Sequence, residues 1–193
     1  MKKLVILLML VLFAGVAQAS TINVDWGAVR NVGVTYNGNA KTVGTTQFDV
    51  LIDGSFLTFG YCIDLDGEIY KNRNYLVDVL DDTGYKHASW LMDTYADSAD
   101  DSYKRAGLQL AIWESIYKET FNYNPSGLVG THYTNYFSPT YSTNLNYEYN
   151  ILDHVNDDYQ NLLVRGNAVP EPATLFLVGF GLLTVSGIAR KKS

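Results

Sequence analysis

The chain has 193 residues, of which 20 are acidic and 14 are basic, and its formal net charge is −6 at pH 7. Proteins that bind nucleic acid or anionic membrane surfaces concentrate positive charge, so this composition argues against both partners. The 15 tyrosines and 16 glycines fit an extracellular domain rich in β-structure.

The first 19 residues have the three parts of a secretory signal peptide. Lys2 and Lys3 give a positive start, residues 4–16 form an apolar run, and Ala17-Gln18-Ala19 is a small-x-small cleavage site. Cleavage there would make Ser20 the first mature residue. A retained membrane anchor is the alternative, which the short apolar run disfavours.

Residues 21–80 show the alternating apolar pattern of β-strands joined by tight turns. Such alternation precedes Asn37-Gly38 and again precedes Asp53-Gly54, and both dipeptides are typical of two-residue hairpin turns. A further strand is expected over residues 74–80. The pattern predicts an antiparallel sheet built from hairpins.

The strand after the second turn contains the single cysteine of the chain. Larger apolar side chains alternate from Leu57 to Leu65, which places Cys62 on the opposite face of the strand. Gly60 shares that face and has no side chain, so we expect another element to approach there.

Beyond residue 85 the spacing of apolar residues becomes helical. Together with the strands, the helices predict an α+β fold, in which an antiparallel sheet or barrel packs with a small helical part. The expected elements are a helix around 88–95, a helix over 103–119 capped by Asp101 or Ser102, a long loop over 121–145 with one short strand, and a last helix over 147–163.

Gln109 lies within the apolar stripe of the second predicted helix, between Trp113 and Ile116 at 100° per residue. A buried carboxamide without hydrogen-bond partners costs about 1–3 kcal/mol. Its position therefore indicates a specific partner. Residue type alone leaves open whether that partner is a backbone group or a reactive side chain.

One cysteine in an exported protein indicates an intermolecular bridge, a buried inert thiol or a reactive role. If the fold holds the Cys62 sulfur against the Gln109 carbonyl, an effective concentration of about 10⁵–10⁸ M favours loss of ammonia and an internal thioester. An amine could then displace the sulfur and leave an amide at position 109. Tyr61 and Trp113 are the expected covers that exclude water.

The two segments read aromatic-Cys-Ile-Asp at 61–64 and Leu-Gln-Leu-Ala-Ile-Trp-Glu at 108–114. With these residues they resemble the thioester domains of bacterial surface adhesins. The resemblance implies a bond between Cys62 and Gln109, and a β-structure joined to a helical part. Leu108 is a departure, because many adhesins have threonine before the glutamine.

The C-terminal end also has three parts. They are the motif Val169, Pro170, Glu171 and Pro172, a predicted transmembrane helix at 173–189, and the basic cluster Arg190, Lys191 and Lys192. Over residues 168–193 this end resembles the PEP-CTERM sorting signal of Gram-negative bacteria. The resemblance implies export, transient anchoring in the inner membrane, recognition by an exosortase and removal of the tail. A plain C-terminal anchor is the alternative.

Between the two ends, residues 20–167 have a size that suits one domain. Five of the 14 basic residues and one of the 20 acidic residues lie in the ends, which leaves nine and 19 and a net charge near −10. The histidines show no zinc spacing, the acidic loops lack the spacing of a calcium loop, and no glycine pattern for phosphate occurs. We therefore expect no metal or cofactor.

The sequence thus predicts an exported cell-surface or matrix protein that is not an enzyme. Its Cys62–Gln109 thioester would attach it once to an amine on a surface protein or matrix component, as in adhesion. A non-covalent structural or carbohydrate-binding protein of a biofilm matrix is the alternative. A hydrolase that pairs Cys62 with a histidine is disfavoured, because a mid-strand cysteine lacks the activation that a helix N-terminus gives.

Overall fold

The structure is a computed structural model, and all the residues that it describes belong to one unit of the chain, residues 21–169. The predicted signal peptide and the predicted C-terminal transmembrane helix lie outside the described residues. The described ranges are 22–69, 75–78, 83–137, 149–154 and 160–165.

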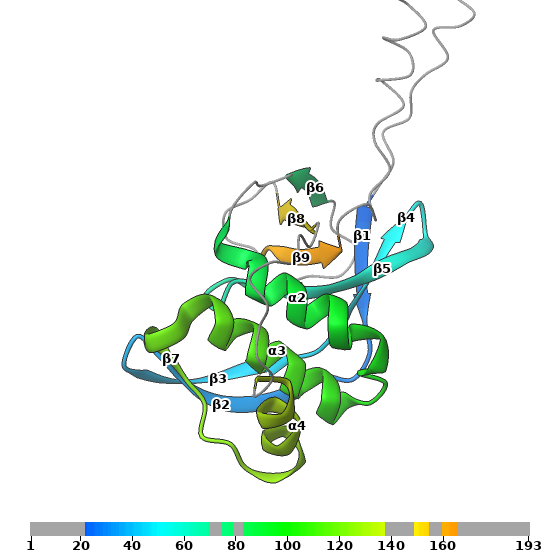
Figure 1. Ribbon diagram of the computed structural model, residues 1–193. Coiled ribbons are helices and arrows are strands. Elements are labelled where there is room, and N and C mark those ends of the chain that lie inside the picture. The colour runs from blue at the N-terminus through cyan, green and yellow to red at the C-terminus, as the bar shows by residue number, and fades with distance from the viewer. Residues whose placement is uncertain (1–21, 70–74, 79–82, 138–148, 155–159, 166–193) are drawn as a thin grey trace, which may run out of the picture. The chain divides into compact units, whose positions relative to one another are not determined.

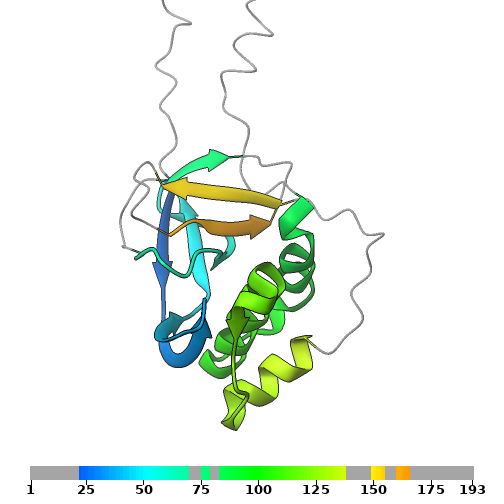
Figure 2. The same ribbon diagram turned by 90° about the vertical axis from the view of Figure 1, so that its left-hand side faces the viewer.

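In this part of the chain, nine strands form two antiparallel sheets, and they are β1 (Ile22–Trp26), β2 (Arg30–Tyr36), β3 (Asn39–Thr45), β4 (Phe48–Ile52), β5 (Ser55–Cys62), β6 (Tyr75–Asp78), β7 (Phe121–Asn122), β8 (Tyr149–His154) and β9 (Leu162–Arg165). The larger sheet has the order β1-β4-β5-β9-β8-β6, and the smaller has the order β3-β2-β7. The edge strands β1 and β6 approach each other, so the larger sheet is strongly curved (Figure 2).

Two hairpins confirm the predicted sheet. The β2–β3 turn is Asn37-Gly38, with φ of 50° and 77°, and the β4–β5 turn is Asp53-Gly54, with φ of 49° and 81°. Positive φ at both central residues is the geometry of a type I′ turn, whose twist matches that of the paired strands. The local sequence therefore determines both hairpins.

Within the described ranges, three α-helices pack beside the sheets (Figure 1): α2 (Lys86–Tyr95), α3 (Ser102–Tyr117) and α4 (Gly127–Phe137). Helix α3 contacts both other helices and also β2, β3, β5 and β7. The side chain of Asp101 accepts hydrogen bonds from the backbone N–H groups of Tyr103 and Lys104, at 2.7 and 2.9 Å, which confirms the predicted cap. Among the described residues, no helix is long and apolar enough to cross a membrane.

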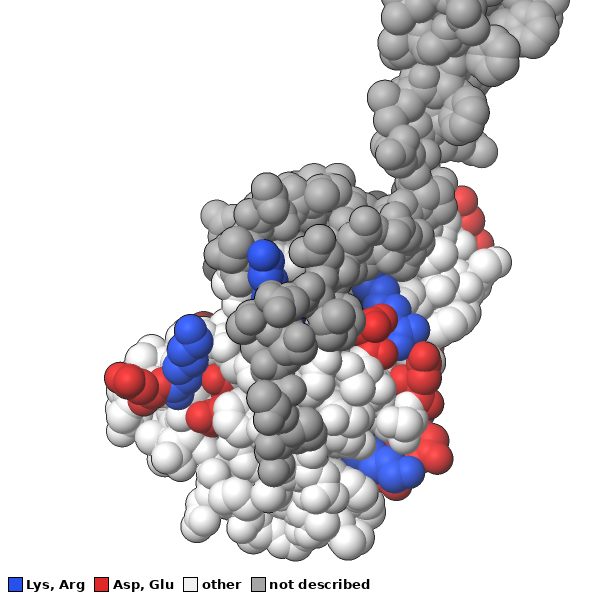
Figure 3. Space-filling model, in the orientation of Figure 1, with Lys and Arg blue, Asp and Glu red and all other residues white. Residues whose placement is uncertain are grey.

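Close packing of α4 on α3 depends on Gly107. A Cβ atom there would lie 2.7 Å from the His132 Cβ and 2.8 Å from the Tyr133 backbone nitrogen. Any side chain would therefore push the helices apart. Helix α4 has no charged residue, and the surface around it is uncoloured in Figure 3, whereas acidic and basic residues are interspersed elsewhere on that face.

Two predictions for the C-terminal half were wrong. The predicted helix over 147–163 is replaced by the strands β8 and β9, and the predicted loop over 121–145 contains α4. Consecutive apolar residues such as Leu162 and Leu163 also fit a strand that is buried on both faces, and both side chains are 0% exposed. The weak helix formers of α4 adopt a helix because they pack on α3.

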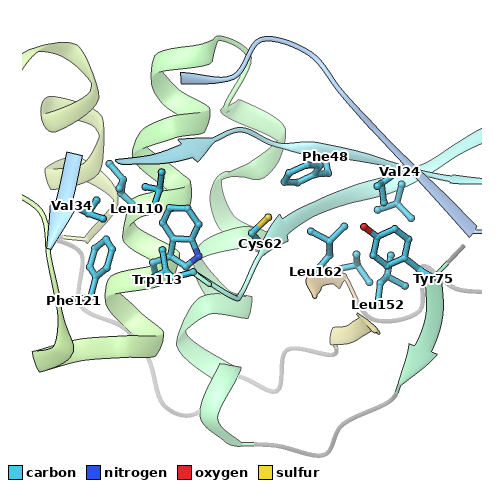
Figure 4. Packing of buried hydrophobic residues seen from close by; sticks show 14 of the residues in the cluster. Val24, Val34, Phe48, Cys62, Tyr75, Leu110, Trp113, Phe121, Leu152 and Leu162 are labelled. Atoms are coloured by element: carbon cyan, nitrogen blue, oxygen red, sulfur yellow. The ribbon is translucent and has the colours of Figure 1, made fainter. Parts of the chain in front are cut away.

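Two clusters of buried side chains lie on the two faces of β5. One contains Cys62 with Trp113, and the other contains Tyr61 with Leu108. Figure 4 shows the Cys62 cluster, with Trp113 to one side of the cysteine and Leu162 to the other. The elements that approach at Gly60 are the neighbouring strands, because a Cβ there would lie within 3.3 Å of side chains from β4 and β9.

Candidate functional site

Cys62 is the last residue of β5 and is 3% exposed. Strand β9 pairs with one edge of β5 opposite Cys62, and just beyond it the Ile63 N–H donates to the Asn161 carbonyl at 3.0 Å. Consecutive residues of an antiparallel strand direct their backbone groups to opposite edges. The N–H and C=O of Cys62 therefore face away from β9. The strand on that side, β4, begins at Phe48 opposite Gly60 and does not reach Cys62.

Gln109 of α3 takes the place of this missing strand. Its Nε2 donates to the Cys62 carbonyl at 2.8 Å, and its Oε1 accepts from the Cys62 N–H at 3.0 Å. The residue is 1% exposed. Because both polar atoms of the side chain are used in this way, Gln109 ties α3 to the end of β5.

A second glutamine, Gln160, presents its carboxamide to the Cys62 sulfur. Cys62 Sγ lies 2.8 Å from Gln160 Oε1. This separation is as short as that of a typical hydrogen bond between two oxygens, although sulfur is the larger atom. Because a C=O bond is about 1.2 Å long, the carbonyl carbon lies within about 4 Å of the sulfur. That is close to the approach of about 3–3.5 Å from which an attack begins.

Hydrogen bonds to the loop after β5 hold Gln160 in this position. Its Nε2 donates to the Asp64 carbonyl at 2.9 Å, and its backbone N–H donates to the Glu68 carbonyl at 3.1 Å. The next residue, Asn161, donates its N–H to the Asp64 carboxylate at 2.8 Å. The nitrogen of the Gln160 side chain is thus held by the loop, and its oxygen is directed at the sulfur.

Two more residues of α3 continue the face that carries Gln109. Trp113 and Tyr117 follow it at intervals of four residues, so the three side chains share one side of the helix. The Tyr117 hydroxyl donates to the Ile63 carbonyl at 2.8 Å. Trp113 lies between these two contacts, in the same buried cluster as Cys62, and Figure 4 shows its indole ring beside the cysteine.

The environment of Cys62 favours the neutral thiol. Burial raises the pKa of the thiol well above its ordinary value, and the negative charge of Asp64 raises it further. Burial likewise raises the pKa of Tyr75 and of Tyr117, so both phenols are neutral at physiological pH. A protonated, buried thiol is a poor nucleophile toward reagents in solution. The chemistry of the thiol therefore depends on the Gln160 carboxamide, which the fold holds in contact with it.

Comparison with known proteins identifies a sorting signal at the C-terminus. Residues 168–192 match the family model of the PEP-CTERM protein-sorting motif. The chain carries a PEP-CTERM sorting motif. It is thus an exported protein of the kind that Gram-negative bacteria sort at the membrane.

A solved structure resembles the fold of this chain. It is the N-terminal thioester domain of fibronectin-binding protein SfbI from Streptococcus pyogenes, with 16% sequence identity and a TM-score of 0.49. The similarity covers 78% of this chain and 95% of that domain. No match was found among curated protein sequences.

The structure brings Cys62 and Gln109 together, but through the main chain of the cysteine. The predicted contact between the sulfur and the Gln109 carbonyl is therefore corrected, because the carbonyl that faces the sulfur belongs to Gln160. Turning Gln109 toward the sulfur would break two buried hydrogen bonds, at a cost of about 1–3 kcal/mol for each group left without a partner.

Of the two residues that were expected to cover the sulfur, one lies where it was predicted and the other does not. Trp113 lies on the Cys62 side of β5, as expected. Tyr61 does not cover the sulfur, because it lies on the opposite face, where its hydroxyl accepts a hydrogen bond from Gln47 Nε2 at 3.0 Å. The sorting residues Val169 to Pro172 lie outside the described residues. In the described part of the chain, no group of three or more His, Cys, Asp or Glu residues could hold a metal ion.

Sequence analysis missed Gln160 because it assigned residues 147–163 to a helix. Two signals opposed that assignment. Asn156-Asp157-Asp158 is a turn-type cluster in the middle of the segment. Leu162-Leu163-Val164 is a short apolar run of the kind that forms a buried strand. Together they would have placed Gln160 just before a strand, although the pairing of that strand with β5 has no local signal.

Proposed function

We propose that this exported protein forms an internal thioester between the Cys62 sulfur and the Gln160 side chain. The bond would attach the protein once, covalently, to an amine on a surface protein or matrix component. The observation that carries the proposal is the 2.8 Å contact between Sγ and Oε1. It is supported by Gln109, which already satisfies the main chain of Cys62 and leaves the sulfur to Gln160.

Formation of the bond transfers the acyl group from nitrogen to sulfur. The thiol adds to the carbonyl carbon of Gln160, the C–N bond breaks, and the thiol proton leaves with the nitrogen as ammonia. Contact within the fold replaces a bimolecular encounter and supplies an effective concentration of about 10⁵–10⁸ M. The high pKa of Cys62 means that the proton needed by the leaving nitrogen arrives with the sulfur.

Attachment reverses the roles of nitrogen and sulfur. A primary amine adds to the same carbon, the C–S bond breaks, and a proton passes from the amine to the sulfur. The products are an amide at position 160 and a free thiol at Cys62. Cys62 is buried whereas Gln160 is partly exposed, so an amine reaches the carbon from the Gln160 side. Ammonia is lost and Gln160 is consumed, so each molecule reacts once and there is no turnover.

The intact mass of the exported protein, with and without methylamine, tests the proposal. We expect the wild type to be short by the mass of one ammonia, and to gain one methylamine and one titratable thiol on treatment. Peptide mapping should place the methylamide at position 160. Cys62→Ala and Gln160→Glu should have their full sequence mass and no adduct, because one lacks the nucleophile and the other the amide.

Two results would decide against this assignment. A methylamide at position 109 would transfer the acyl role to the helix glutamine. A wild type of full mass, with unmodified Gln160 and a free Cys62, would reject the thioester and favour a non-covalent matrix protein. Glutamate at position 160 of the wild type would identify a bond that had formed and been hydrolysed.

A further inference from the structure

The indole N–H of Trp113 is a buried donor that lacks an acceptor. The residue is 1% exposed, and among the described residues its Nε1 has no hydrogen-bond partner. Leaving such a group unpaired costs about 1–3 kcal/mol, and buried tryptophans usually find an acceptor. Because this donor is unpaired in a well-packed core, we expect it to find its acceptor in a state other than the resting structure.

Helix α3 holds this donor beside the proposed acyl site. Gln109, one turn before Trp113, is hydrogen-bonded to both main-chain groups of Cys62. Tyr117, one turn after it, is hydrogen-bonded to the Ile63 carbonyl. The rise of an α-helix puts each of these residues about 6 Å from Trp113 along the axis. The indole is thus held between two contacts to consecutive residues of the segment that carries the sulfur.

The ring is oriented with its polar edge toward the cysteine. Trp113 packs against Phe121 on one side, with ring centroids 6.3 Å apart. In Figure 4 the indole nitrogen is on the edge of the ring nearer Cys62, and Phe121 and Val34 lie on the other side. The apolar edge is therefore packed in the core, while the edge that carries the N–H is the one nearer Cys62, whose sulfur contacts Gln160.

The proposed chemistry creates a need for a donor at this place. When sulfur or an amine adds to the carbonyl carbon, the Gln160 oxygen gains negative charge. In the resting structure that oxygen accepts from the Cys62 thiol, but the thiol proton is lost from the sulfur as the bond forms. The oxygen thus loses its donor at the moment when its charge rises. A fixed and buried N–H, as in Trp113, stabilises such a charge far more than a donor in water does.

We propose that Trp113 Nε1 donates a hydrogen bond to the Gln160 oxygen in the tetrahedral intermediates of thioester formation and opening. This inference rests on the proposed thioester, and it gives Trp113 a catalytic role beyond that of a cover. Both reactions pass through an intermediate with the same oxygen, so one donor serves both.

The test compares the rate of methylamine opening in the wild type and in Trp113→Phe. Phenylalanine keeps an aromatic cover but removes the donor. We expect opening to slow at least tenfold, toward the roughly 10²–10³-fold that loss of one oxyanion donor costs. A tryptophan that only covers the bond predicts the opposite sign, because a smaller ring admits amine and water and speeds opening. Trp90→Phe, in the other cluster, is the matched control and should leave the rate unchanged.

Each outcome has a defined meaning. Opening of Trp113→Phe at the wild-type rate or faster overturns the inference, and so does equal slowing in Trp90→Phe. A folded Trp113→Phe protein of full mass with unmodified Gln160 supports it, because formation needs the same donor. If the phenylalanine variant does not fold, benzothienylalanine at position 113 replaces N–H by sulfur with little change of shape and should slow opening. A wild type without any thioester would reject the proposed function itself.

Discussion

Two glutamines meet Cys62 from different regions of the molecule. Gln109 comes from the middle of α3 and bonds to the main chain of the cysteine with both of its polar atoms. Gln160 comes from the segment just before β9 and places its carbonyl oxygen 2.8 Å from the sulfur. The side chains are chemically identical and share a neighbour. What separates them is which atoms of the cysteine each one faces.

The surroundings of the two residues suit two different tasks. Gln109 is 1% exposed, on a helix whose middle is buried on nearly all sides, so it is fixed and out of reach of solvent. Gln160 is partly exposed and held by the loop after β5. A residue that positions a strand end benefits from rigidity, whereas an acyl donor must be reached by an outside amine. Proximity of a glutamine to the cysteine residue alone therefore does not distinguish the two; the atom of the cysteine that each one contacts and its exposure do.

The largest expected effect concerns the covalent bond itself. A link between Cys62 and Gln160 would close a loop across a sequence separation of 98 residues. In the chain-entropy model, a cross-link over about 100 residues stabilises a protein by up to about 4–5 kcal/mol. We expect opening by methylamine to lower the free energy of unfolding by an amount of this order, measured by urea denaturation. Gln160→Ala, which has no bond to open, should not respond to methylamine.

The second expected effect concerns the contribution of Gln109 to stability. It is measured in a Cys62→Ala background, where no thioester can form. Gln109→Met keeps the length of the side chain but leaves the N–H and C=O of residue 62 buried without partners. We expect a loss of about 2–5 kcal/mol in the free energy of unfolding. Gln160→Ala in the same background should lose about 0.5–1.5 kcal/mol, the worth of one hydrogen bond. Equal losses for the two variants would remove the contrast between a positioning and a reacting glutamine.

Local signals account for the parts of this fold that the sequence predicts. The Asn-Gly and Asp-Gly turns and the Asp101 cap each act over a few residues, and the structure confirms them. The apolar stripe predicted for α3 is too narrow, because every residue from 106 to 113 is buried. The apolar spacing also predicted that Gln109 is buried, and the resemblance to adhesin thioester domains paired it with Cys62. The local signals also contained the reason to exclude Tyr61 as a cover, since neighbours on a strand point to opposite faces.

The partner of the sulfur could not be predicted in this way. Gln160 reaches Cys62 because β9 pairs with β5, and no local pattern specifies a pairing across 98 residues. The apolar residues of 147–163 fit both a helical and a strand period, and only the turn-type cluster at 156–158 and the short apolar run at 162–164 favour the strand. Had the antiparallel pairing of β9 with β5 been known, it would have placed the two residues before β9, Gln160 and Asn161, beside the end of β5.

A third, smaller effect concerns the charge beside the sulfur. In the Gln160→Ala protein, whose thiol is free, alkylation of Cys62 should continue to accelerate above the ordinary thiol pKa of about 8.5, because burial and Asp64 raise the pKa. Asp64→Asn keeps an oxygen for the Asn161 N–H but removes the charge. We expect it to shift the rate profile toward lower pH, by less than burial shifts it upward. The rate of reaction with iodoacetamide against pH measures both.

The raised pKa of Cys62 also determines how the free energy of unfolding changes with pH. The folded thiol has a higher pKa than the unfolded one, so its contribution to stability is fully present below the unfolded pKa and is lost as pH rises through the folded pKa. The free energy of unfolding of Gln160→Ala should therefore fall in alkaline solution, and less steeply when Asp64 is replaced by Asn. An alkaline profile that Asp64→Asn leaves unchanged would contradict a role for this charge.

The smallest expected effect tests whether the positioning helix can be weakened without touching the reaction. Asp101→Ala removes the N-cap of α3 and should lower the free energy of unfolding by about 1 kcal/mol, whereas Asp101→Asn retains a capping oxygen and should cost less. Gln109 lies about two turns into the helix, beyond the reach of fraying at the cap. The rate of methylamine opening should therefore be the same in both variants and the wild type. A rate that followed the loss of stability would mean that the helix end is coupled to the acyl site, and the separation between a glutamine that positions and one that reacts would have to be given up.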